Sequence, residues 1–147
     1  MAFKFRFQSV LHYRRHQAEI AEMELAKARR QLALAEEQVA SLKARREDAE
    51  SRLAHCLQKG VMGPKLQLWR LYLTDLETKI HEEVQRTEAM GLAVEDLRSR
   101  LLEANRKKKS MEKLLDREER AWWQAENKIQ EKELSEAAVR LHARRSS

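Results

Sequence analysis

The stretch QKGVMGPKL, residues 58–66, decides the fold, because it holds the strongest break in an otherwise continuous helical pattern. Gly60 can adopt the left-handed conformation that ends a helix. Pro64 suits the first turn of a following helix, where its missing N–H is not needed. The remaining glycine outside this stretch, Gly91, has no proline beside it. The sequence therefore predicts two helices joined by a short turn at about residues 59–64.

Hydrophobic residues recur every seven positions on both sides of the turn, which is typical of a coiled coil. Before the turn, the two rows of this seam are Leu11, Ala18, Leu25, Leu32, Val39, Arg46, Leu53 and Phe7, Arg14, Ala21, Ala28, Ala35, Leu42, Ala49, Cys56. After the turn, they are Leu66, Leu73, Ile80, Thr87, Val94, Leu101, Lys108, Leu115, Trp122, Ile129 and Trp69, Leu76, Glu83, Met90, Leu97, Ala104, Met111, Glu118, Ala125. An antiparallel register in which Cys56 faces Leu66 and Leu42 faces Ile80 brings the two seams together.

We therefore expect an all-α fold: a long antiparallel two-helix coiled-coil hairpin in which helix 2 overhangs at its C-terminal end. Residues 1–147 form a single hairpin in this prediction. Helix 1 covers about 7–58 and helix 2 about 65–141, with a frayed tail to 147. Alanines on helix 1 lie opposite larger residues on helix 2, which lets the helices approach closely.

A few seam positions are polar or poorly suited to a helix. Arg46 and Glu83 lie in the seam, Arg14 faces Lys108 as a like-charge layer, and Gly91 lies in a helix interior. These positions fit register control and local softness, since charged side chains can reach water at the edges of a two-stranded coil. A hinge or a contact point is the alternative.

Composition restricts the class of protein. The chain has 147 residues, of which 37% are charged and 5% aromatic, and its net charge of +6 arises from interleaved bases and acids. The single cysteine, Cys56, excludes an internal disulfide and fits a reducing compartment. The sequence shows neither an apolar run of about 20 residues nor a secretory signal. We therefore expect a cytoplasmic protein.

The overhang, defined as the part of helix 2 after Glu118, is the first candidate docking surface. Helix 1 ends opposite this residue, whereas the seam continues through Trp122, Ala125 and Ile129, with Trp123 on the flank. Apolar residues without cover indicate docking, and Trp is enriched at binding hot spots. Self-association is an alternative. Another is that the segment FKFRF, residues 3–7, folds back over Trp122 or Trp123.

The tip patch, defined as Leu68, Leu71 and Tyr72, is the second candidate surface. These residues are apolar, lie off the seam and come close to Val61 and Met62 of the turn. They either form a partner site or merely thicken a fraying helix end.

The basic belt, the third candidate, comprises Arg14, Arg15, Arg106, Lys107, Lys108 and Lys109. A run of charges is usually a solvated helix face, and contact with an acidic partner or anionic lipid is the alternative. We do not expect nucleic-acid binding, because no interleaved aromatic residues or known binding motif accompany the bases.

Catalysis is not expected from this sequence. A two-helix hairpin has no concave pocket that could desolvate a small-molecule substrate, and Cys56 falls in the seam. His12, His16 and Glu19 share a helix face with metal-ligand spacing, but the neighbouring bases disfavour a cation. We expect no catalytic residues, no cofactor and no metal site.

Four segments, in this order and spacing, resemble the FliJ family of flagellar type III export proteins. They are FKFRFQSVLHYRR at 3–15, AEEQVASL at 35–42, WRLYLTDLETKI at 69–80 and AENKIQEKELSE at 125–136. The resemblance covers nearly the whole chain, with a Gly-containing turn near residue 60. It implies a non-enzymatic, stalk-like hairpin at the flagellar base, peripheral to the inner membrane, in motility and protein transport.

The same resemblance implies three partners: the hexameric export ATPase FliI, the export gate protein FlhA, and export chaperones. It would place Gln38, Leu42, Tyr72 and Leu76 at the gate, which agrees with the tip patch and adds Leu68 to the gate-binding residues. The overhang would meet the ATPase ring. Arg45 and Ala49 depart from the aromatics of some relatives. The equivalent stalk of a virulence-type secretion system, or a basic adaptor for nucleic acid or anionic membrane, are the alternatives.

Overall fold

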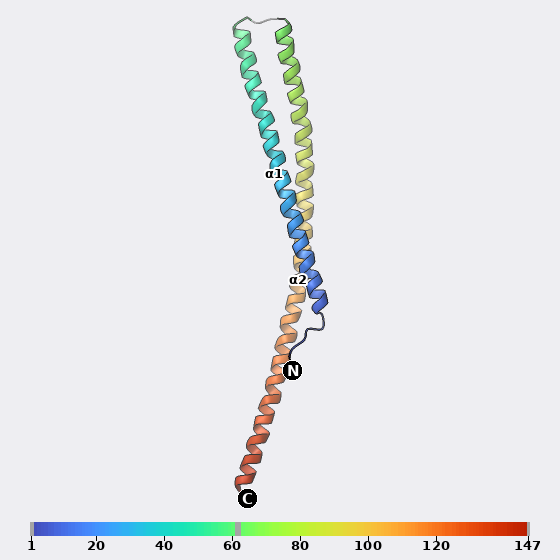
Figure 1. The fold of residues 1–147 in the computed structure, drawn as a ribbon, viewed down its shortest axis with the longest axis vertical. Coiled ribbons are helices and arrows are strands. Elements are labelled where there is room, and N and C mark those ends of the chain that lie inside the picture. Colours follow the sequence, from blue (N-terminus) through green and yellow to red (C-terminus); the bar gives the residue numbers. More distant parts are fainter. Residues whose placement is uncertain (1, 61–62, 147) are drawn as a thin grey trace. The chain divides into compact units, whose positions relative to one another are not determined.

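The computed structural model describes residues 2–60 and 63–146, in which the chain forms two helices and no strand. Helix α1 spans Gln8–Gln58 and helix α2 spans Pro64–Ser146 (Figure 1). The antiparallel helical hairpin predicted from the heptads is confirmed. Helix α2 continues past the predicted end near residue 141, because its last residues are helix-favouring Ala, Leu and Arg. Arg144 and Arg145 also complement the helix dipole in the final turn.

Two glycines of the turn adopt the left-handed backbone conformation, with φ of 78° at Gly60 and 83° at Gly63. Gly60 follows the last turn of α1, and its N–H donates to the carbonyl oxygen of Leu57 at 3.1 Å. Gly63 caps α2, since its carbonyl oxygen accepts from the N–H of Gln67 at 3.2 Å. Pro64 is the first residue of α2. The turn thus follows the chemistry that its sequence predicts.

Burial follows the predicted seam. On helix α1 and the residue before it, every seam position from Phe7 to Cys56 is buried or half-buried. On α2 the same holds from Leu66 to Trp122, whereas Ala125 and Ile129 are exposed. The heptad pattern therefore matches the pattern of burial, which ends at Trp122.

Contacts divide the chain into two compact units, residues 20–101 and residues 1–19 with 102–147. In the first, which contains the turn, Leu42, Ala49, Leu76 and Ile80 form the buried cluster. Trp69, Leu73 and Val84 pack against it while keeping partial exposure. Leu42 and Ile80, which the register predicts to face each other, belong to the same cluster. This cluster is the apolar core of the unit that contains the turn.

In the second unit, residues 2–7 form a non-helical N-terminal strap that leads into α1. Phe5 is buried, and its ring lies edge-on to Phe7 with centroids 5.9 Å apart. The strap is tied to α1 by the N–H of Gln8, which donates to the carbonyl oxygen of Phe5 at 3.2 Å. Arg6 pairs with Glu118 of α2 at 3.1 Å. Leu11 is fully buried between α1 and α2.

The polar seam positions are half-buried, as expected in a two-stranded coil. Glu83 pairs with Arg86 at 3.8 Å, and the carbonyl oxygen of Glu83 accepts from the Thr87 hydroxyl at 2.7 Å. Arg14 and Lys108, which the register predicts to face each other, are both half-buried. These layers are locally less favourable than the apolar ones around Leu42.

Candidate docking surfaces

The overhang is a preformed helix that carries exposed apolar side chains. Helix α2 continues through it to Ser146, and its residues after Glu126 are all exposed up to that point. Figure 1 shows this part of α2 in orange to red, beyond the N-terminal strap. Trp123 and Ile129 are each 53% exposed. An apolar helix surface of this kind is suited to docking a second protein.

The two tryptophans have different surroundings. The ring of Phe3 lies against Trp122, with centroids 6.1 Å apart, so that Trp122 is half-buried. Trp123 stacks edge-on against Trp122 at 4.9 Å and keeps its outer face exposed. The expectation that Trp122 has no partner within the chain is therefore corrected. The alternative, in which residues 3–7 fold back, describes Trp122 but leaves Trp123 open.

The overhang carries a second apolar stripe, which lies off the predicted seam. It runs through Trp123, Leu134 and Leu141, of which the last two are 71% and 57% exposed. These residues are separated by about three and two helical turns, so they share one face. Asn127, Gln130, Ala137 and Ala138 lie between them on this face, and Glu126 and Glu131 lie at its edges. The spacing of three, four and seven positions could have revealed it.

The tip patch is exposed beside the turn. Leu68 is 65%, Leu71 63% and Tyr72 44% exposed. Lys65, Leu68, Trp69 and Tyr72 line an open apolar groove. The ring of Tyr72 packs edge-on against Trp69 at 6.2 Å, which holds it in place. Val61 and Met62, which were expected nearby, lie outside the described residues.

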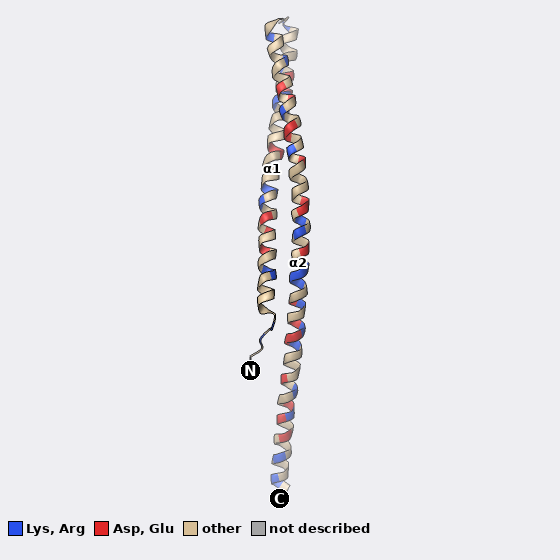
Figure 2. Cartoon of the chain, turned by 90° about the vertical axis from the view of Figure 1, so that its right-hand side faces the viewer, with Lys and Arg blue, Asp and Glu red and all other residues tan. Residues whose placement is uncertain are grey.

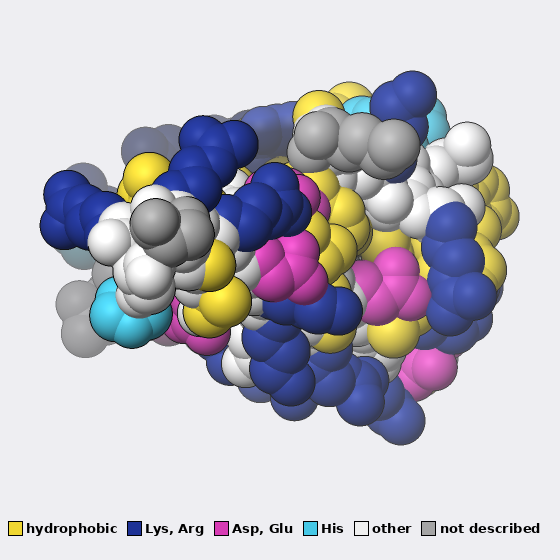
Figure 3. All heavy atoms as spheres, turned by 90° about the horizontal axis from the view of Figure 1, so that it is seen from below, with side chains coloured by type: hydrophobic (Ala, Val, Ile, Leu, Met, Phe, Trp, Pro, Cys, Tyr) yellow, Lys and Arg dark blue, Asp and Glu magenta, His cyan; other side chains and the backbone are white. Residues whose placement is uncertain are grey.

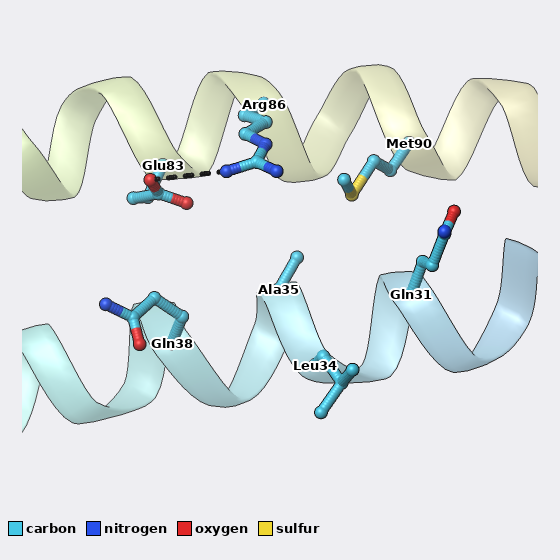
Figure 4. A pocket seen from close by; sticks show the side chains of 7 residues that line it. All are labelled: Gln31, Leu34, Ala35, Gln38, Glu83, Arg86 and Met90. Atoms are coloured by element: carbon cyan, nitrogen blue, oxygen red, sulfur yellow. Dashed lines mark ion pairs between the residues drawn. The ribbon is translucent and has the colours of Figure 1, made fainter.

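The residues that the resemblance assigns to the gate do not form one surface. Leu42 and Leu76 are buried between the helices, so in this structure they build the core and offer no side chain to a partner. Gln38 and Tyr72 are exposed but line different grooves. Figure 4 shows the Gln38 groove, with the Glu83–Arg86 ion pair on its α2 side. A gate site on this unit therefore rests on Gln38 or on Leu68 and Tyr72.

The basic belt is partly neutralised by carboxylates. Arg15 pairs with Glu112 at 3.5 Å, and Arg106 pairs with Glu103 at 3.0 Å. Arg14 lies over the Tyr13 ring at 5.4 Å, and residues 107–109 make no ion pair with a described residue. Figure 2 shows bases and acids alternating along both helices, and Figure 3 shows Lys and Arg beside acidic and hydrophobic side chains. The bases do not form an uninterrupted positive surface.

The described residues offer little for chemistry. Cys56 is half-buried in the seam and unpaired. Within residues 2–60 and 63–146 there is no group of three or more His, Cys, Asp or Glu side chains arranged to hold a metal ion. Neither helix, over its described residues, has a stretch that is both long and apolar enough to cross a bilayer.

Comparison with known proteins assigns the chain to a family. The model of the family described as Flagellar FliJ protein matches residues 3–147. No curated protein and no solved structure matches the chain. The family match includes the strap, both helices and the overhang, and a two-helix hairpin agrees with the coiled coil that the sequence predicts. The chain belongs to the FliJ family, whose members are non-enzymatic export components, and it is a component of flagellar type III protein export.

Proposed function

We propose that the protein is a stalk that couples the export ATPase FliI to the export gate protein FlhA. The overhang docks into the hexameric ATPase ring, and the tip patch contacts the gate. Binding to the gate would hold the chain at the inner membrane of the flagellar base. Escort of export chaperones is proposed from the family resemblance alone.

The observation that carries this proposal is the uncovered overhang. A helix end that exposes Trp123, Ile129 and Leu134 without cover from α1 presents the large apolar anchors that dominate protein interfaces. Because the helix is already formed, a partner does not have to order it on binding. The narrow, single-helix form of this segment also suits insertion into the centre of a ring.

The tip patch supports the second half of the proposal. Its groove is apolar and has a basic residue, Lys65, at one side. Leu68 and Tyr72 are four residues apart, so they present one flank of α2 to a partner. A gate segment with an apolar side chain and an acidic neighbour would fit this flank.

The mechanism is mechanical and allosteric. A stalk that binds both the ring and the gate links the state of one to the state of the other through a coupling free energy. We propose that docking of the overhang promotes ring assembly or raises the rate of ATP hydrolysis. No side chain of this protein takes part in the hydrolysis itself.

Replacing Trp123 and Ile129 together by alanine tests the ring contact. Truncation of two exposed anchors should weaken binding to the purified export ATPase about tenfold or more. Stimulation of ATP hydrolysis should fall in parallel. A pull-down, a titration followed by interferometry, and steady-state ATPase assays measure these effects.

The matched control replaces Met23 and Leu92, which are 69% and 74% exposed and lie outside the overhang. This variant should bind like the unmodified protein. Equal affinity of both variants for the export ATPase, with helicity retained in circular dichroism, would contradict the assignment of the overhang to the ATPase. A third variant, with Leu68 and Tyr72 replaced by alanine, should lose the gate protein and keep the ATPase.

A further inference from the structure

The N-terminal strap covers the point at which the seam becomes free. Helix α1 begins at Gln8, and the strap continues beside α2 toward the overhang. Phe3 packs against Trp122 at 6.1 Å, and Arg6 pairs with Glu118, which lies one helical turn before Trp122. Ala125 and Ile129, the next seam positions, are exposed. Phe3 thus occupies the position that a further helix would take if it continued the seam.

The two ends of the strap are held differently. Phe5 is 8% exposed, and its carbonyl oxygen accepts from the N–H of Gln8, which fixes the strap to the start of α1. Phe3 is only half-buried, and Lys4 is exposed. The Arg6 side chain in the ion pair to Glu118 is 72% exposed, and a pair of that kind stabilises little. The strap can therefore open at Phe3 while it stays anchored at Phe5.

A partner helix that packs onto the free seam meets this cover first. In a coiled coil, each seam residue inserts between side chains of the facing helix. The face of Trp122 that Phe3 contacts cannot receive a partner side chain at the same time. Docking on Trp122 and closure of the strap exclude each other, whereas Trp123 and Ile129 stay open in both cases.

We propose that the ring of Phe3 acts as a latch that closes over Trp122 and is displaced when a partner helix extends the seam. The latch holds an apolar surface out of water while the overhang is empty. The apparent affinity of that surface for a partner is then the affinity of the open form multiplied by the fraction of open molecules. This inference rests on the proposed docking of the export ATPase at the overhang.

Fluorescence of the isolated protein tests the closed latch without any partner. In a background with Trp69→Phe and Trp123→Phe, Trp122 is the sole tryptophan. Phe3→Ser should shift its emission to longer wavelength and raise its quenching by acrylamide. Lys4→Ser, which alters an exposed neighbour, should do neither. Identical spectra and quenching for Phe3→Ser and Lys4→Ser would show that no latch closes over Trp122.

Binding of the export ATPase tests the competition, in the chain with all three tryptophans. Phe3→Ser should tighten binding about two- to tenfold, the range expected for one aromatic contact. Lys4→Ser should bind like the unmodified protein, and Phe3→Tyr, which keeps the ring, should too. Weaker binding of Phe3→Ser would make Phe3 part of the docking surface, and unchanged binding would leave it without a regulatory role, so either result overturns the latch.

Failure of the proposed function gives a different result. If the unmodified chain does not bind the ATPase, the docking proposal and the latch role fall together. If the unmodified chain binds and the Trp123/Ile129 variant does not, the docking proposal stands, and the Phe3→Ser affinity alone decides the latch.

Discussion

Arg46 is the residue at which the seam departs most from an apolar coiled coil. It occupies a seam position next to the cluster of Leu42, Ala49 and Leu76. Among the described residues, its Nε is the single buried side-chain nitrogen or oxygen without a hydrogen-bond partner. The distance of 3.9 Å from Nε to Glu50 Oε1 is an ion pair but too long for a hydrogen bond. We expect this unsatisfied N–H to lower the free energy of unfolding of the hairpin.

Arg46→Leu should therefore stabilise the hairpin. The change removes a desolvated N–H and adds apolar area, so the free energy of unfolding should rise by about 1–2 kcal/mol. Urea unfolding followed by circular dichroism at 222 nm measures it. Arg52→Leu is the control, because Arg52 is exposed and pairs with Asp48 within one helix. A drop in stability for Arg46→Leu would show that this charge holds the register.

Gly91 of α2 and Gly60 of the turn have opposite roles. Gly91 lies inside α2 without a left-handed φ, and a Cβ added there meets no atom within 4 Å. Gly60 has a φ of 78°, which a side chain disfavours. Gly91→Ala should stabilise the protein by about 1 kcal/mol. Gly60→Ala should destabilise it by about 1–2 kcal/mol.

Thermal melting of the two glycine variants, each compared with the unmodified protein, measures this difference. Each variant serves as the control for the other, because the same Gly→Ala change is expected to raise stability at one position and lower it at the other. A shift of the same sign in both would mean that the unfolded chain, rather than these backbone conformations, determines the effect.

At the scale of the elements, the heptad pattern predicted which residues pack between the helices. Leu42, Ile80 and Val94 are buried where the seam places them, and Gly60 ends the first helix. Periodicity reports burial well because each helix buries one stripe. Periodicity could not predict the latch, because the segment 2–4 that contains Phe3 is too short to show a period. Nor could it foretell the end of α2, where no partner within the chain selects a stopping point.

The candidate surfaces were predictable in part, for a related reason. Trp123, Ile129 and Tyr72 could be chosen because they are apolar and lie at uncovered or off-seam positions. Leu42 and Leu76 came from the family resemblance, and their own heptad positions already placed them in the seam. Leu134 and Leu141 were not predicted, because they lie on a face of the helix that the seam rows do not include.

For the whole molecule, the charge pattern favours protein partners over polyanions. The net charge of +6 is distributed among carboxylates, and the belt arginines Arg15 and Arg106 are already paired. Interactions with a distant anionic surface are screened beyond about 8 Å at physiological ionic strength. Non-specific attraction to duplex DNA or to an anionic bilayer should therefore be weak.

We expect no retention of the protein on phosphatidylserine vesicles or on duplex DNA at physiological salt. Co-sedimentation with vesicles and an electrophoretic mobility assay check this outcome. The comparison is a variant with Lys107, Lys108 and Lys109 changed to glutamine. Strong retention of the unmodified protein that this variant loses would favour a basic adaptor over a stalk.

The continuity of α2 has a consequence for how the overhang exists at all. An isolated helix has to form its first turn before it can extend, and forming that turn is unfavourable in water. In this chain, the part of α2 paired with α1 supplies that first turn, and the overhang grows from it. The helicity of the overhang thus depends on the packing of the preceding part of α2 against α1. A peptide with the sequence of the overhang alone would be a poor substitute for it, since the peptide would first have to nucleate.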